Sequence, residues 1–315
     1  MIRRRTLLST ALAATAAIGL AACSKDDSGS SASDGGSDGG GAAALSGVDV
    51  SDDLGSEPTV SFTAPLSIDA ADARVIAAGD GATLAEGDTV IMRSMYVDAS
   101  TGETLQSWWQ GAPAGGLQVT SDGLGAEAFA FFQTVTVGSR FAMAGWQQDS
   151  SGNAVSLVQV GDVDRVVSPL RAEGAEQKPS GSYPKVTLGK DGAPAIDGPG
   201  SGDAPAKTVR EVLIEGTGDT TRKGDYLTMH YTGWAWETGE QFDSSWERGA
   251  PFSFVQGQGQ VISGWDDNLL DLKVGSQVML VIPGDEAYPA DSGSELAGQT
   301  LIFVVDVLDA AHTNA

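Results

Sequence analysis

The 315-residue sequence predicts an α+β fold with two related units, each a twisted antiparallel β-sheet wrapped around one short α-helix. Three observations lead to this prediction. Motifs recur at a constant separation, short apolar runs end at turn residues, and one amphipathic helical segment stands out in the second half of the chain. Many strands with few helices are typical of α+β domains built on an antiparallel sheet.

The repeat defines the two units. Three pairs of motifs share one separation along the chain, that from Gly87 to Gly224, here called the repeat interval. Such a constant interval indicates a duplicated unit. A weaker likeness between 58–62 and 184–188 has another separation. We predict units at 56–170 and 183–311, joined by a linker at 171–182. The motif pairs are Glu86-Gly87-Asp88 with Lys223-Gly224-Asp225, Gly102-Glu103-Thr104-Leu105 with Gly239-Glu240-Gln241-Phe242, and Val137-Gly138-Ser139 with Val274-Gly275-Ser276.

The elements of the second unit follow from its local patterns. Runs rich in β-branched and aromatic residues, bounded by Gly-containing turns, predict strands at 208–214, 226–236, 252–255, 278–282 and 300–308. Ser263 is expected to cap a helix, with Asp266 three residues on as in a capping box. Trp265, Leu269 and Leu272 share one face of that helix at spacings of four and three.

The N-terminus has the pattern of a targeting signal. Three arginines precede an apolar run, Thr6–Leu20, that is short for a membrane span. The run ends in Leu20-Ala21-Ala22-Cys23, which resembles a bacterial lipobox and contains the chain's only cysteine. We expect 1–22 to be a lipoprotein signal peptide, Cys23 to be lipidated, and 23–55 to be a flexible Ser/Gly/Asp-rich tether. The expected location is extracytoplasmic, anchored to the cell membrane by lipid. The alternative is an ordinary signal peptide with a chance cysteine.

Composition excludes several classes of function. The chain has 42 acidic against 18 basic residues, a net charge of −24, so nucleic acid is not an expected partner. The acidity is explained by solubility outside the cell or by an attraction for basic clients. One cysteine and two histidines argue against a disulfide, zinc, and Cys–His or Ser–His catalysis. We expect no cofactor and no metal.

Ordered motifs in the second unit resemble the FKBP family of peptidyl-prolyl cis-trans isomerases. The resemblance extends over 207–310, and no single motif carries it. The motifs are His230-Tyr231-Thr232-Gly233, Phe242-Asp243-Ser244-Ser245, Pro251-Phe252-Ser253-Phe254, Val261-Ile262-Ser263-Gly264-Trp265, Val274-Gly275-Ser276, Ala287-Tyr288 and Leu301-Ile302-Phe303-Val304.

The resemblance implies a site for non-covalent catalysis. Rotation about an Xaa-Pro bond makes and breaks no covalent bond, so a dry pocket and fixed donors that favour the twisted amide suffice. Tyr231, Asp243 and Trp265 would be the catalytic residues, with Trp265 as the floor of the pocket and Asp243 near the twisting amide. The Ile262 N–H and the Tyr288 hydroxyl would bind peptide carbonyls. The substrate-binding residues would be Phe242, Phe252, Val261, Ile262, Tyr288 and Phe303.

Two departures from this pattern qualify the expectation. After Tyr288 the chain continues with Pro289 and a short polar loop, in which Leu296 is expected to supply an apolar contact. In the first unit the repeat interval places Ser94, Gln106 and Ala128 where the second has Tyr231, Asp243 and Trp265. We therefore expect the first unit to keep the fold without the activity.

The predicted function is peptidyl-prolyl cis-trans isomerisation of Xaa-Pro bonds in secreted or cell-envelope proteins. The expected partners are proline-containing polypeptides, macrolides of the tacrolimus/rapamycin type, and the membrane through the lipid anchor. The alternative is a non-enzymatic chaperone or client-binding lipoprotein.

Overall fold

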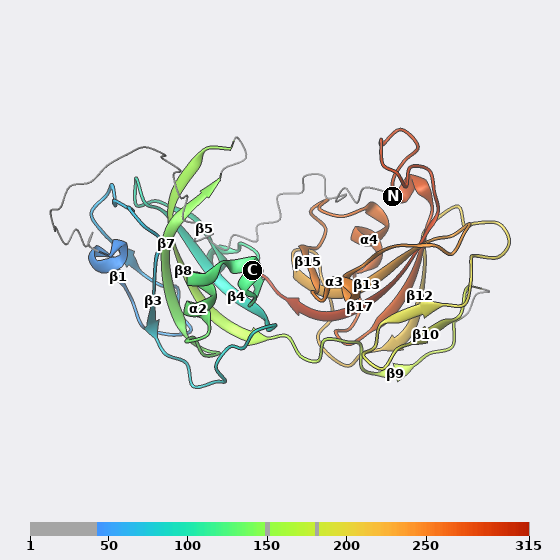
Figure 1. Cartoon of the computed structure of the whole chain (residues 1–315), viewed down its shortest axis with the longest axis horizontal. Helices are drawn as coiled ribbons and strands as arrows, with labels where there is room; N and C mark the ends of the chain where they lie inside the picture. The colour runs from blue at the N-terminus through green and yellow to red at the C-terminus, as the bar shows by residue number, and fades with distance from the viewer. Residues whose placement is uncertain (1–42, 149–151, 180–182, 315) are drawn as a thin grey trace, which may run out of the picture. The chain divides into compact units, whose positions relative to one another are not determined.

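The computed structural model describes residues 43–148, 152–179 and 183–314 (Figure 1). The chain divides into two compact units, one ending at Val166 and the other spanning Val167–Asn314. The expected signal peptide and Cys23 lie outside the described residues. None of the helices in the described part of the chain is long and apolar enough to cross a membrane.

The first unit is an antiparallel sheet of six strands with short helices. The strand order is β3-β7-β8-β4-β5, and β6 also pairs with β4. Its elements are η1 (Ala44–Gly47), β1 (Asp49–Val50), β2 (Val60–Ser61), β3 (Asp72–Ala77), β4 (Thr89–Asp98), β5 (Thr104–Ser107), η2 (Trp108–Gln110), β6 (Gly115–Gln118), α1 (Ser121–Leu124), α2 (Ala126–Phe132), β7 (Arg140–Gln148) and β8 (Ala154–Val166).

The second unit repeats this arrangement with seven strands. The order is β14-β13-β17-β16-β12-β9, and β15 pairs with β13. Its elements are β9 (Ala175–Glu176), β10 (Val186–Leu188), β11 (Pro194–Ile196), β12 (Val209–Glu215), β13 (Tyr226–Ala235), β14 (Gln241–Ser244), α3 (Ser245–Arg248), β15 (Phe252–Val255), α4 (Ser263–Asn268), β16 (Gln277–Ile282), η3 (Gly284–Glu286) and β17 (Leu301–Ala311).

The two sheets correspond strand by strand, apart from the added β9. Breaks in strand pairing are also related by the repeat interval, between Ile91 and Met92 in β4 and between Thr228 and Met229 in β13. The weaker likeness of 58–62 with 184–188 is not a structural equivalence, because the former contains the second strand of a hairpin and the latter the first. The expectation of an α+β fold with antiparallel sheets is confirmed.

Each face of the second sheet is covered by other parts of its unit. Side chains at alternate positions along a strand point to opposite faces, so β17 contributes Phe303 to one core and Ile302 to another. On the first face lies α4 (Figure 1). The opposite face packs under residues 183–204, here called the second cover, which includes β10 and β11. Its apolar contacts with that face are made by Tyr183, Val186, Ile196 and Ala204.

The first unit has an equivalent cover, residues 44–68, over the face of the sheet opposite α2. Leu45 and Val48 are buried there, and the Leu45 N–H donates to Asp72. The expected flexible tether at 23–55 is therefore wrong for residues 43–55. These residues carry apolar side chains that pack on the sheet.

The expected linker at 171–182 is also corrected where it is described. β9 pairs with β12 in the sheet of the second unit. The Ala172 N–H donates to the Asp306 carboxylate at 2.8 Å. Residues 171–179 thus belong to the second unit, since their backbone groups are bonded to its strands.

The helix expected at Ser263 is present but differs in detail. α4 ends at Asn268, its N-cap is Ile262, and there is no capping box. The Asp266 carboxylate instead accepts hydrogen bonds from the N–H groups of Gly257 and Gly259, at 2.9 and 2.7 Å. A second short helix, α3, was not expected. Leu269 and Leu272 follow α4 and are buried in the same core as Trp265.

Candidate active site

The aromatic residues that the sequence singled out in the second unit form one cluster. Trp265 on α4 is 4% exposed and lies between Tyr231 of β13 and Phe303 of β17, with ring centroids at 5.1 and 5.2 Å. Phe252 of β15 is 6.1 Å from Trp265, and Phe242 of β14 is 5.5 Å from Phe303. Most of these pairs are edge to face, the arrangement that the charge distribution of aromatic rings favours.

The other expected binding residues border this cluster. Val261, Ile262, Tyr288 and Leu296 are half-buried and pack against it. Within the described ranges, the Ile262 N–H and the Tyr288 hydroxyl have no hydrogen-bond partner. Both groups can therefore donate to a ligand. Burial, and then the charge of Asp243, raises the pKa of Tyr288, so its hydroxyl keeps its proton at neutral pH.

A polar trio lies at the edge of the cluster. The Tyr231 hydroxyl donates to one oxygen of Asp243, and the Arg248 guanidinium is bonded to the other. Arg248 also donates to the Tyr231 hydroxyl at 3.0 Å and lies over its ring at 5.4 Å. Burial, and next the bond to Asp243, raises the pKa of Tyr231. The trio holds a neutral phenol and a carboxylate in fixed positions beside apolar rings.

The local sequence explains how the trio is assembled. The Ser244 hydroxyl caps α3 by accepting the Glu247 N–H, and Gly249 ends the helix in the left-handed region at φ 68°. Ser and Gly are the residues preferred at these two positions. A helix of one turn between them brings Arg248 back to Asp243 at the end of β14.

His230 supports the site from the opposite face of β13. Its Nδ1 lies 2.8 Å from the Ser245 hydroxyl, and its ring stacks on Trp246 at 4.1 Å. The Ser245 hydroxyl also accepts the Tyr231 N–H at 2.8 Å. Burial, and then the charge of Arg248, lowers the pKa of His230 to about 4. His230 is therefore neutral at pH 7 and structural in role.

The equivalent positions of the first unit lack this chemistry. Ser94 and Gln159 are buried where the second unit has Tyr231 and Phe303, and the Gln159 amide donates to the Ser94 hydroxyl at 3.2 Å. Ala128 on α2 takes the place of Trp265. The rings that pack on this face are instead those of Phe131, Phe132 and Phe141, with centroids 5.3 to 6.2 Å apart, so the aromatic cluster of the first unit differs in composition from that of the second.

Arg248 is the principal residue that sequence reasoning missed. A signal was present, because Arg248 and Lys273 are the only basic residues after Lys223 apart from His230 and His312. A cation five residues after Asp243 in such an acidic chain indicates a partner for that carboxylate. Among the residues that the structure describes, no group of three or more His, Cys, Asp or Glu side chains is placed to hold a metal ion.

Comparison with known proteins assigns the second unit to a family. The family model described as FKBP-type peptidyl-prolyl cis-trans isomerase matches residues 218–308. An FK506-binding protein of Streptomyces anulatus is 44% identical over 118 residues, which cover 36% of this chain and 94% of that protein. FK506-binding protein 1 of Debaryomyces hansenii is 49% identical over 109 residues, or 34% of this chain and 96% of that protein.

Two of the solved structures that match part of this chain both have a low TM-score. AtFKBP13 is 30% identical, with a TM-score of 0.31, and the match covers 34% of this chain and 96% of that chain. FkpA from Escherichia coli is 29% identical, with a TM-score of 0.31, and the match covers 41% and 52%. Because the two sequence relatives match over almost their whole length at 44% identity or more, this chain belongs to the family of FKBP-type peptidyl-prolyl cis-trans isomerases and is an enzyme of that class.

Proposed function

We propose that the second unit isomerises Xaa-Pro bonds of secreted or cell-envelope polypeptides in an apolar pocket whose floor is Trp265. The observation that supports this most is the convergence of four other aromatic rings on or near Trp265, with the trio of Tyr231, Asp243 and Arg248 at the edge. A proline ring is apolar and compact, and such a cluster offers it a dry surface.

The residues favour a twisted amide in three ways. Rotation of the Xaa-Pro bond removes resonance, against a barrier of about 20 kcal/mol. Exclusion of water by the rings favours the less polar twisted amide. The Ile262 N–H and the Tyr288 hydroxyl would hold the flanking carbonyls, and the charge of Asp243 would act on the rotating carbonyl. Each ~1.4 kcal/mol of preference for the twisted form gives tenfold in rate.

The names of the two sequence relatives support a second ligand class. Both are called FK506-binding proteins. We propose that this chain also binds macrolides of the tacrolimus/rapamycin type, at the aromatic cluster around Trp265. Such a macrolide should compete with a proline peptide for Trp265, and the test is inhibition of turnover by the macrolide.

The lipobox-like motif that ends in Cys23 supports a location at the cell membrane. Lipidation of Cys23 would hold the enzyme at the outer side of the cell membrane, where the slow isomerisation of newly secreted chains occurs over tens of seconds without catalysis. Labelling with palmitate and membrane fractionation of the natural protein test this. A Cys23→Ser variant should lose the label and leave the membrane fraction, and a labelled or membrane-bound variant would contradict the proposal.

A protease-coupled assay with a short Xaa-Pro peptide tests the function on the full chain. The double variant Asp243→Asn/Trp265→Ala should show no acceleration over the uncatalysed rate, because the first unit lacks the required residues. Gln106→Ala, the equivalent of Asp243 in the first unit, is the matched control and should keep full activity. A wild-type chain that is folded yet inactive, while it suppresses aggregation of a client, would favour the alternative of a non-enzymatic chaperone.

A further inference from the structure

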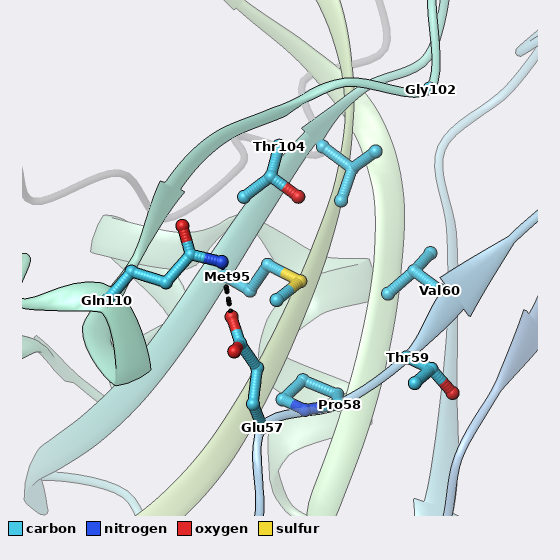
Figure 2. A pocket seen from close by; sticks show the side chains of 9 residues that line it. Glu57, Pro58, Thr59, Val60, Met95, Gly102, Thr104 and Gln110 are labelled. Atoms are coloured by element: carbon cyan, nitrogen blue, oxygen red, sulfur yellow. Dashed lines mark hydrogen bonds between the residues drawn. The ribbon is translucent and has the colours of Figure 1, made fainter.

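A second surface feature lies in the first unit. A hollow of about 360 Å³ opens between the cover 44–68 and the strands β4 and β5. Figure 2 shows Pro58 and Val60 of the cover on one side, with Met95 and Thr104 of the two strands on the other. The hollow is lined by Glu57, Pro58, Thr59, Val60, Met95, Val97, Gly102, Thr104 and Gln110.

The corresponding place in the second unit is filled by the protein itself. Val97, which is 2% exposed under the hollow, corresponds through the repeat interval to Trp234, which is buried under the second cover. A Cβ atom placed on Gly239 would lie 2.9 Å from the backbone of Pro199, whereas one on the equivalent Gly102 would meet no atom within 4 Å. The second unit thus fits an indole and a stretch of proline-containing backbone where the first is open.

The charge of the lining restricts the ligand further. Glu57 is its only ionisable residue. Its Oε1 accepts hydrogen bonds from the Ser107 hydroxyl at 2.9 Å and from the Gln110 amide at 2.7 Å. In the described part of the chain, Oε2 has no partner, and the residue is exposed. A fixed carboxylate at the rim of an open hollow attracts a cation.

We propose that this hollow binds an extended polypeptide segment that carries a bulky aromatic side chain next to a lysine or arginine. The aromatic side chain lies over Met95 and Val97, in the space that Trp234 fills in the other unit. The neighbouring cation pairs with Glu57. This site is separate from the isomerase site, and it gives the catalytically degenerate unit a role in holding unfolded clients.

The test is peptide binding to the full chain, followed by fluorescence anisotropy. The probe is a fluorescein-labelled peptide, Ser-Gly-Lys-Trp-Lys-Gly-Ser, which contains no proline and so does not depend on prolyl turnover. We expect saturable binding that weakens at least tenfold when alanine replaces the tryptophan of the peptide. It should weaken at least threefold when glutamates replace the lysines or when salt is raised to about 0.5 M.

Variants locate the binding. Val97→Trp fills the hollow from below, and Thr104→Trp covers it from an exposed position, so the second variant does not depend on how the core tolerates the first. Both should weaken binding about tenfold without changing the isomerase rate. Glu57→Gln keeps the acceptor for Ser107 and should remove most of the salt dependence.

The matched control is Gln241→Trp, at the position in the second unit that corresponds to Thr104. It should bind the peptide within twofold of the wild type. The proposal is overturned if the wild type shows no saturable binding. It is equally overturned if folded Thr104→Trp binds as well as the wild type, or if Gln241→Trp loses binding to the same extent.

Discussion

Replacement of Asp243 by asparagine separates catalysis from stability at the site. The substitution keeps the size of the side chain and an acceptor for the Tyr231 hydroxyl, but it removes the charge that holds Arg248. The side chains of Asp243 and Arg248 are 39% and 46% exposed. Ion pairs at that exposure contribute about 0–1 kcal/mol to folding, because solvent and salt screen them.

The expected effect on catalysis is larger than the effect on folding. In the proposed mechanism the carboxylate acts where the amide twists, in surroundings made less polar by the rings around Trp265. Loss of about 1.4–2.8 kcal/mol of differential binding corresponds to a ten- to hundredfold fall in kcat/KM. The melting temperature should fall by only a few degrees, since ~1 kcal/mol has that effect in a domain of this size.

Three measurements check the reasoning: the isomerase rate on an Xaa-Pro peptide, thermal unfolding, and a titration of tyrosine absorbance. Burial is the largest cause of the raised pKa of Tyr231, and Asp243 is the next. The variant should therefore show a Tyr231 pKa that is lower than in the wild type but still above the ordinary value for tyrosine. Asp267→Asn, an exposed carboxyl on α4, is the control. A variant that retains kcat/KM within twofold, with an unchanged tyrosine titration, would refute the electrostatic role.

The remaining predictions concern burial and pH. Trp265→Ala should cost about 3–5 kcal/mol of unfolding free energy in denaturant and remove activity, because it empties the centre of the cluster; a loss under 1 kcal/mol would contradict the packing described. Burial raises the pKa of Asp306 from 3.8 to about 6, although two hydrogen bonds act to lower it. Between these two pH values the folded state therefore binds a proton that the unfolded state has lost. The unfolding free energy should fall as pH rises through this window, by up to ~3 kcal/mol. The unfolding free energy is measured at pH 4.5 and at pH 7.5 for the wild type and for Asp306→Asn. The decrease between the two pH values should be smaller in the variant, and an equal decrease in both proteins would contradict the raised pKa of Asp306. Because the pKa of His230 is lowered to about 4, kcat/KM should be flat between pH 6 and 8, and an inflection near 6.5 that disappears in a His230 variant would be inconsistent with a neutral, structural histidine.

The sequence was most informative where pattern and spacing reflect burial. Strands β12, β13, β15, β16 and β17 lie within a few residues of their expected positions, because runs of apolar and β-branched residues mark strands that are buried in a sheet, whereas β14 was not expected. The residues expected at the site, such as Tyr231 and Trp265, were brought together because ordered motifs carry long-range information that local propensity does not. The duplication could also be recognised from the sequence, because the repeat interval is the same for all three motif pairs even though Ala128 stands where the second unit has Trp265.

Other features depended on contacts that no local pattern encodes. Arg248 reaches Asp243 only because Ser244 and Gly249 limit α3 to one turn. The residues of the expected tether and linker are polar and Gly-rich on average, yet apolar side chains such as Leu45 anchor residues 43–55 to one sheet, and backbone hydrogen bonds hold residues 171–179 to the other. Composition averages over a window, whereas burial is decided by single side chains.

The covers also determine how this protein can be divided. A fragment limited to the family match, 218–308, lacks residues 183–204 and so leaves Trp234, Trp236 and Ile302 without the layer that shields them. A contiguous aromatic and aliphatic surface of this kind promotes self-association. A soluble catalytic fragment should therefore begin before Tyr183, so that it includes the whole of the second cover.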